Sequence, residues 1–160
     1  MFLVMWAAIL LLAEVAVAPY MAPEMARGET FDPETGWLVH SASVENSTIV
    51  YERPVVLLPP RMTVGEVHTS QRRFVLRVDG EKRQVGAHYF EAELLGTVSL
   101  PGYDDCLKVR RSALRMDYSG RQLGYDVTEW YARGVGVVRV KGKRFWKNAE
   151  GEVTRSEPIE

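Results

Sequence analysis

Closely spaced turn residues are the feature that most constrains the fold of this chain. From residue 37 onward, short apolar or alternating runs are separated by Gly, Pro, Asp, Asn and Ser. Three dipeptides stand between such runs and suit tight hairpin turns, because they contain residues that tolerate positive φ: Asp79-Gly80, Ser119-Gly120 and Glu150-Gly151. Hairpins join strands that are neighbours in sequence, so the pattern predicts a mainly β chain folded as an antiparallel meander.

The runs predict strands at residues 37–44, 48–58, 64–71, 74–78, 84–93, 96–100, 106–118, 123–132, 135–140 and 144–146. Within 106–118 the alternation changes phase, since Leu107 and Val109 are out of step with Leu114 and Met116. A bulge or strong bend near Arg110-Arg111 would bring both pairs to one face. Long bent strands of this kind predict a strongly coiled sheet or half-barrel, with Leu114, Met116, Val127 and Tyr131 on its concave face.

The first eighteen residues, "MFLVMWAAILLLAEVAVA", form an apolar run that predicts one N-terminal hydrophobic helix. The "AVA" that ends at Ala18 has the small-x-small form of a signal-peptide cleavage site, whereas Pro19 and the lack of an early Lys or Arg disfavour cleavage. A retained membrane anchor is the alternative, because residues 2–22 are long enough to cross a bilayer with Glu14 toward one edge. A buried core helix is a third interpretation, but the run lacks a polar face of helical period.

Whether residues 1–18 are a signal peptide or a membrane anchor, they predict that the rest of the chain lies on the extracytoplasmic face of a membrane, in a bacterial periplasm or envelope. Residues 19–36 are rich in Pro, Gly and acids and are predicted to be a linker. The β domain is then expected at 37–160, a length that can bury a single core without a metal or disulfide. Cys106 is the only cysteine, which excludes an intramolecular disulfide.

Three stretches resemble a known group of proteins: "LLPPRMTVGEV" at 57–67, "VSLPGYDDCLKV" at 98–109 and "TEWYARGVGVVRV" at 128–140. Their order resembles exported bacterial proteins and lipoproteins of unassigned function that are open half-barrels, similar in shape to the periplasmic lipoprotein carriers. The resemblance covers about half of the chain and implies a fold more than an activity. The chain departs from it in one respect, because the lipid-bearing cysteine that follows the signal in many such proteins is missing.

The glycines of "WYARGVGVV" invite a phosphate-binding interpretation, but that motif needs a helix after the glycines. Here a valine-rich strand follows, so we expect a structural hairpin. Gly134 would supply the positive φ of the turn, and Gly136 would leave room for a close approach by another segment.

Cys106 could act as a nucleophile with His40, His68 or His88 as its base, but nothing near it predicts a lowered pKa. We expect it to be a small buried side chain. Asp104 and Asp105 follow a Pro-Gly turn, where solvated acids are common. The histidines lack metal-ligand spacing. The sequence therefore predicts a chain that is not an enzyme, with no catalytic, metal or cofactor site.

A basic run is the one surface with the character of a partner site. Six cations occur from Arg133 to Lys147 without an acid between them, although the net charge of the chain is only −1. Cations beside aromatic residues suit an acidic protein or an anionic lipid, and nucleic acid is not expected from the overall charge balance. The candidate partner-binding residues are Arg139, Lys141, Lys143, Arg144, Phe145 and Trp146.

Two functions follow from these expectations. The first is a non-catalytic extracytoplasmic β-domain that serves as an accessory or scaffold subunit of a membrane or envelope complex. The alternative is a carrier that holds a hydrophobic or acyl ligand in the concave face of the half-barrel. A carrier needs that face to be open, whereas a scaffold can have it filled by its own residues.

Overall fold

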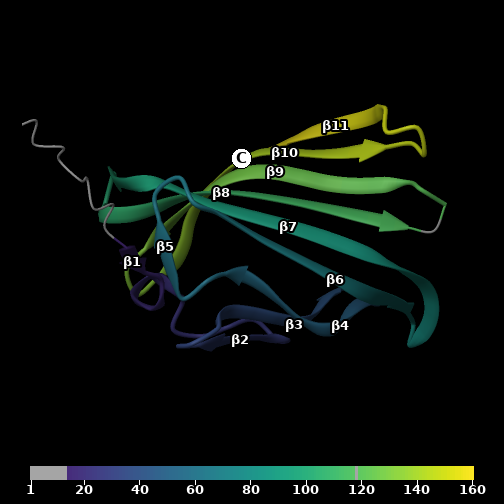
Figure 1. Ribbon diagram of the computed structural model, residues 1–160, viewed down its shortest axis with the longest axis horizontal. Coiled ribbons are helices and arrows are strands. Elements are labelled where there is room, and N and C mark those ends of the chain that lie inside the picture. Colours follow the sequence, from purple (N-terminus) through teal and green to yellow (C-terminus); the bar gives the residue numbers. More distant parts are fainter. Residues whose placement is uncertain (1–13, 118) are drawn as a thin grey trace, which may run out of the picture.

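The computed structural model describes residues 14–117 and 119–160, which are almost entirely β (Figure 1). Among these residues, nine strands form one antiparallel sheet in the order β11-β10-β9-β8-β7-β6-β4-β3-β2. They are β2 (Glu29–Asp32), β3 (Gly36–Val44), β4 (Ser47–Leu58), β6 (Val67–Val78), β7 (Glu81–Leu100), β8 (Tyr103–Asp117), β9 (Gln122–Ala132), β10 (Gly136–Lys147) and β11 (Val153–Ile159). Strands β1 (Glu14–Ala16) and β5 (Arg61–Thr63) pair with each other. The predicted mainly β, antiparallel architecture is confirmed, and β2 and β11 are the two edges of a sheet that does not close into a barrel.

The turns lie where the sequence places them. Asp79 and Gly80 both have positive φ, 52° and 79°, which is the geometry that a two-residue hairpin between β6 and β7 requires. Gly134 has φ 70° and turns the chain from β9 into β10. Gly136 has φ 90°, and a Cβ at this position would lie 3.0 Å from the Cβ of Ala22. The segment that approaches Gly136 closely is therefore the N-terminal one.

Several strands are longer than the sequence pattern predicts. β6 continues through Arg72-Arg73, where a break is expected between two strands. Arg72 lies on the inner face and donates to the Pro54 carbonyl, and Arg73 is exposed on the outer face, so neither residue needs a turn. β7 continues through Gly96, where the register with β8 shifts between Leu94 and Gly96. The bulge lets one strand span the region predicted as two.

The predicted bulge at Arg110-Arg111 is wrong. The β8–β9 ladder runs without a register shift from Leu107–Tyr131 to Met116–Gln122, so strict alternation holds along β8. Val109, Arg111 and Ala113 therefore share one face, and Leu114 and Met116 lie on the other. We call the face that carries Phe90, Ala92 and Leu94 of β7 the inner face, and the opposite one the outer face. Of the predicted concave lining, Val127 and Tyr131 lie on the inner face, and Leu114 and Met116 do not.

Most of the predicted N-terminal helix, residues 1–13, lies outside the described residues. Its last part is a strand instead, because Glu14–Ala16 pairs with β5. Among the described residues no helix is long and apolar enough to cross a membrane. The predicted linker at 19–36 contains a 3-10 turn, η1 (Ala18–Tyr20), and strand β2, whose Phe31 pairs with Trp37 of β3. The folded part of the chain thus begins well before residue 37.

The core lies against the inner face and is partly built by the N-terminal segment, residues 15–21. Val17 and Tyr20 have 0% and 2% of their surface exposed. They pack with Leu58, Met62, Ala92, Leu94, Leu107, Val109 and Tyr131, a set that we call the inner cluster. Main-chain bonds fix the segment in place, from Val17 N–H to the Pro60 carbonyl (3.0 Å) and from Gly134 N–H to the Pro19 carbonyl (2.8 Å). The chain therefore covers this part of its own sheet.

A second cluster continues the inner face toward the other end of the strands. It joins β3 and β4 to β7 and β8 through Val39, Val55, Leu57, Phe90 and Ala113, with Trp37, Tyr51 and Tyr125 at its margin. In Figure 1, β2, β3 and β4 lie below β8, β9 and β10, and β7 and β6 bend between them at the right of the view. The curvature of the sheet thus brings its first and last strands to opposite sides of the core.

One charged group is buried within this core. Arg111 donates to the hydroxyl of Tyr125 (2.7 Å), forms an ion pair with Glu129 (3.3 Å) and stacks on Trp37. Burial alone would lower the pKa of Arg111, but Tyr131, Tyr125 and Glu129 together raise it well above its usual value. Tyr131 donates to Glu129, so the carboxylate is held by two partners. The charged guanidinium therefore links Tyr125, Tyr131 and Glu129 on the inner face.

Candidate binding surfaces

The basic strip predicted on β10 is divided between two faces. Strict alternation places Arg139, Lys141, Lys143 and Phe145 on the outer face, where their ladder partners are Trp130, Thr128, Asp126 and Gly124 of β9. Arg144 and Trp146 lie on the inner face, opposite Tyr125 and Leu123. The six candidate residues thus form no single surface, because a strand sends successive side chains to opposite sides.

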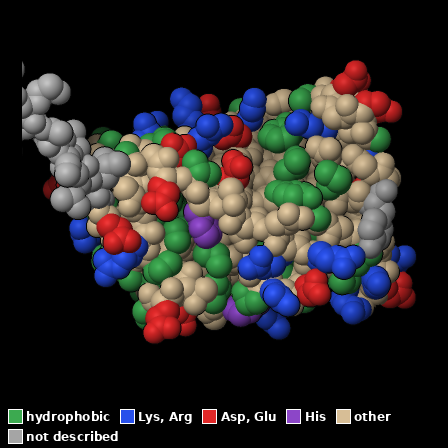
Figure 2. All heavy atoms as spheres, viewed as in Figure 1, with side chains coloured by type: hydrophobic (Ala, Val, Ile, Leu, Met, Phe, Trp, Pro, Cys, Tyr) green, Lys and Arg blue, Asp and Glu red, His purple; other side chains and the backbone are tan. Residues whose placement is uncertain are grey.

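Neighbouring strands also supply acids that the chain order does not show. Lys143 stands opposite Asp126, and Arg110 together with Lys143 lowers the pKa of that carboxyl group. Arg144 stands opposite Glu157 of β11. Figure 2 shows the same mixture, with basic and acidic side chains interspersed over the visible face. The positive potential of the strip is therefore weaker than its sequence indicates.

The aromatic residues of the strip are engaged by cations of the chain itself. The guanidinium of Arg139 lies 4.9 Å from the ring centre of Trp130, and that of Arg155 lies 4.5 Å from Trp146. Lys147 lies over Phe145 at 5.3 Å. These contacts fix the strip locally, and Lys141 is an exposed cation on the part of β10 that β11 does not pair with.

That edge is open over part of its length. Within the described residues, β11 pairs only with Gly142–Lys147 of β10. A recess of about 570 Å³ lies beside the remaining part and is lined by Val137, Val138, Arg139, Val140, Lys141 and Glu160. Every second residue of such a stretch offers its main-chain N–H and C=O to the free side, which allows another strand to add there.

The candidate catalytic residues are not assembled into a site. Cys106 is fully buried in a small outer-face cluster with Trp130 and Ala132, and burial raises the pKa of its thiol. His40 bonds to Thr30, and burial lowers the pKa of His68. Asp104 and Asp105 are exposed beside their turn. Across residues 14–117 and 119–160, no cluster of three His, Cys, Asp or Glu side chains could hold a metal ion.

His88 has the most altered chemistry of the three histidines. Its Nδ1 lies 2.8 Å from the Tyr51 hydroxyl, and its ring is stacked 4.1 Å from that of Phe90. Burial, and secondarily the charge of Arg115, lowers the pKa of His88 to about 3, while burial raises the pKa of Tyr51. With its pKa lowered this far, His88 is a weak base, and its contacts in the structure are with the side chains of Tyr51 and Phe90.

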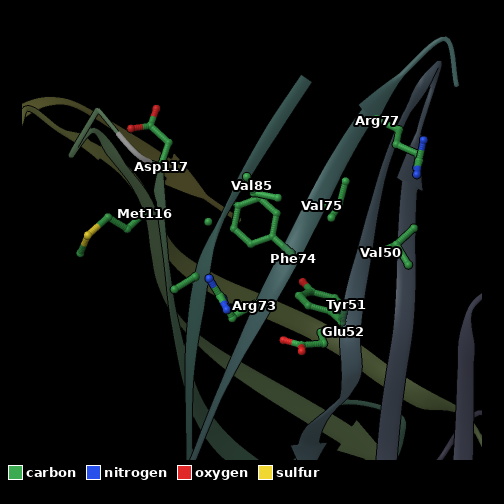
Figure 3. Close-up of a pocket in the computed structure, with 12 residues that line it drawn as sticks. Val50, Tyr51, Glu52, Arg73, Phe74, Val75, Arg77, Val85, Met116 and Asp117 are labelled. Atoms are coloured by element: carbon green, nitrogen blue, oxygen red, sulfur yellow. The ribbon is translucent and has the colours of Figure 1, made fainter. Parts of the chain in front are cut away.

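The sequence reasoning missed a groove at the far end of the sheet from β1 (Figure 3). It has a volume of about 600 Å³ and is lined from β4, β6, β7 and β8. Ladder partners show which side chains share its face: Val50, Val75 and Val85 form one row, and Arg73, Ala87 and Met116 form the next. By alternation these rows belong to the outer face, opposite the row of Tyr51 and Phe74. The signal in the sequence was the unbroken apolar runs at 49–51 and 74–76, which put apolar residues on both sides of a strand.

Comparison of the chain with family models, curated proteins and solved structures found no match. The resemblance to half-barrel lipoprotein carriers therefore stays a prediction from three stretches of sequence.

Proposed function

We propose that this chain is a non-catalytic β-domain that serves as an accessory or scaffold subunit of a membrane or envelope complex on the extracytoplasmic side. In this proposal the coiled sheet is a filled half-barrel that acts through its surface. The observation that carries the proposal is the packing of the inner face. Val17, Tyr20, Leu58 and Met62 occupy the concavity in which a carrier of the half-barrel type would hold its ligand.

The alternative, a carrier with its ligand on the inner face, would require the N-terminal segment to leave. That step would expose the inner cluster and break the two main-chain bonds that hold Val17 and Pro19. Fully burying one large apolar side chain is worth about 1.5–3 kcal/mol, so releasing Val17 and Tyr20 alone costs several kcal/mol that a bound ligand would have to offset. The packing therefore favours a scaffold over an inner-face carrier.

The partner surface that we propose is the open part of the β10 edge with the cations beside it. Lys141 is exposed at this edge, Arg139 is next to it on the same face, and the main chain of residues 137–141 is free of β11. An acidic partner segment would meet both the charges and the free main-chain groups.

A photo-crosslinking amino acid at position 141 of the membrane-associated protein tests this function, with position 53 as the control. Arg53 is an exposed cation of β4, away from the β10 edge and outside every surface proposed as a binding site. We expect one protein adduct from position 141 that is absent from position 53 and weakens as salt rises. Equal adducts from the two positions would contradict the partner surface, and stoichiometric lipid released from the inner face would favour the carrier.

The expected location is tested separately by fractionation and intact mass of the protein from its source cells. A retained apolar segment predicts membrane-bound protein with an intact N-terminus. A mature protein that starts at Pro19 would lack β1 and Val17, and would contradict retention.

A further inference from the structure

We propose that the groove on the outer face of β4, β6, β7 and β8 binds a single-chain amphiphile with an anionic head group, such as a fatty acid. The proposal rests on the side chains of this groove and does not depend on the scaffold function or on the β10 edge. It places a ligand on the face opposite the one that the N-terminal segment fills.

The apolar part of the groove is a continuous row across three strands. Val50 pairs with Val75, and Val75 pairs with Val85, so three branched side chains stand side by side on one face. Val50 has 41% of its surface exposed, and Val75 and Val85 are half-buried. Ala87 and Met116 extend the same face by one step along the strands. No other segment of the described chain covers this row as the N-terminal segment covers the inner cluster.

The polar part lies one step further toward the β6–β7 turn. There Arg77 lines the groove, Thr48 is its ladder partner on β4, and Lys82 is its partner on β7 just beyond a register shift, so a hydroxyl and a second cation stand beside Arg77. Arg77 donates to the main-chain carbonyl of Gly80 (3.2 Å), and among the described residues it forms no ion pair with an acid. The remaining donors of this row suit a carboxylate or phosphate group.

The acids at the rim decide the direction in which the ligand lies. In Figure 3, the three valines lie between Arg77 on one side and Arg73 with Glu52 on the other. Asp117 also lines the groove, but its carboxylate already accepts bonds from Ser119 and Arg121. An anionic head is therefore expected at Arg77 and Lys82, and the chain runs over the valines toward Ala87 and Met116.

The dimensions suit a single chain. A volume of about 600 Å³ falls within the range of roughly 300–1,000 Å³ that small-molecule sites occupy. Arg73, the ladder partner of Ala87, is four residues from Arg77 along β6, which corresponds to roughly 13 Å along a strand. A medium-length acyl chain can extend over this distance.

Calorimetric titration with dodecanoate, below the concentration at which it forms micelles, tests the proposal. We expect saturable binding of one molecule per chain, and a two- to fourfold gain for each methylene added between octanoate and dodecanoate. Dodecanol should bind more weakly, and dodecyltrimethylammonium should bind more weakly still, because the head-group row is cationic. Vesicles of anionic phospholipid should not compete with dodecanoate, since the proposed ligand is a single monomeric chain.

Matched variants separate the head-group row from general surface charge. Arg77→Gln with Lys82→Gln should weaken dodecanoate binding about three- to tenfold. Arg73→Gln, an exposed arginine at the opposite side of the same groove, should change it less than twofold. Equal losses in the two proteins would overturn the assigned direction of the ligand, and so would tighter binding of the ammonium analogue.

A second set of variants tests the apolar row without disturbing the fold. Val→Thr keeps the branched shape that strands favour, so Val50→Thr, Val75→Thr and Val85→Thr combined should fold and bind dodecanoate at least tenfold more weakly. Val67→Thr is the control, because Val67 is 49% exposed on β6 outside the groove. Circular dichroism and unfolding in urea check the fold. Unchanged affinity in a folded triple variant, no saturable binding in the parent chain or full competition by vesicles would overturn the proposal.

Discussion

The inner cluster and the outer-face groove are both apolar surfaces of one sheet, and they differ in what lies over them. Leu94, Leu107 and Val109 of the inner cluster are fully buried because Val17 and Tyr20 pack on them. Val50, Val75 and Val85 of the groove have comparable side chains and stay partly exposed. A β-sheet buries an apolar face only when another layer covers it, and this chain supplies that layer on one side. The comparison separates the surface that holds the fold together from the one that is free to bind.

The largest effect on stability is expected at the charge inside the inner face. Arg111→Ala removes the guanidinium that pairs with Glu129 and leaves that carboxylate in a buried site. Loss of one member of a buried ion pair costs about 3–5 kcal/mol, which urea unfolding will measure. Arg111→Met with Glu129→Leu is the control, because it removes both charges and should recover part of the loss. An Arg111→Ala protein as stable as the parent would show that the network does not hold the core.

The next largest effect on stability is expected from a side chain removed in the inner cluster, compared with one removed in the outer-face groove. Leu107→Ala in the inner cluster should lower the free energy of unfolding by about 2–5 kcal/mol, because it leaves a cavity in packed surroundings. Val75→Ala in the groove should lower it by less than about 1 kcal/mol, since solvent already reaches that side chain. Similar losses in the two proteins would remove the distinction between the surfaces.

The free energy of unfolding is expected to depend on pH through His88 on the inner face. Its pKa is about 3 in the folded protein and near 6.5 when unfolded, so the unfolded chain binds more protons between these values. The contribution of His88 is fully present above pH 6.5 and is lost as the pH falls toward 3. Between pH 7 and pH 5 the loss is about 2 kcal/mol. We expect His88→Gln to reduce this slope, whereas the exposed His40→Gln should keep it. Parallel pH curves for the parent and His88→Gln would contradict the assignment.

The smallest effect is expected at Cys106. Cys106→Ala should cost about 1 kcal/mol and leave any binding at the groove unchanged, because the thiol is buried in a separate outer-face cluster. In the native protein the thiol should react with a disulfide reagent only slowly, and fast after unfolding in urea. Rapid labelling of the native protein would contradict the burial of this residue.

The parts of the fold that were predictable depend on neighbours in the chain. Asp79-Gly80 and Gly134 mark real turns, since the φ values that a hairpin needs are a property of a few adjacent residues. The bulge predicted near Arg110-Arg111 was wrong because the alternation along one strand does not show that an arginine is buried. The burial of Arg111 depends on Glu129, Tyr125 and Trp37, which come from other strands.

The candidate binding surfaces also depend on contacts between strands, which the order of residues along the chain does not show. The cations of β10 looked unopposed along the chain, and the ladder then placed Asp126 opposite Lys143. Val17 looked like part of an exported leader, and the structure packs it under Leu94 and Leu107. The groove needs the register of β4, β6, β7 and β8, and no local pattern encodes that register before the strands pair.

The most direct test of the central distinction is photolabelling of the native protein with a dodecanoate that carries a photoreactive group at the end of its chain. A covered inner face and an open outer groove predict labels on peptides that contain Val85, Ala87 or Met116, and loss of these labels in the Val50→Thr, Val75→Thr, Val85→Thr protein. Labels on Leu94, Leu107 or Val109 of the inner cluster would contradict it, because a ligand could reach them only if the N-terminal segment had left the sheet.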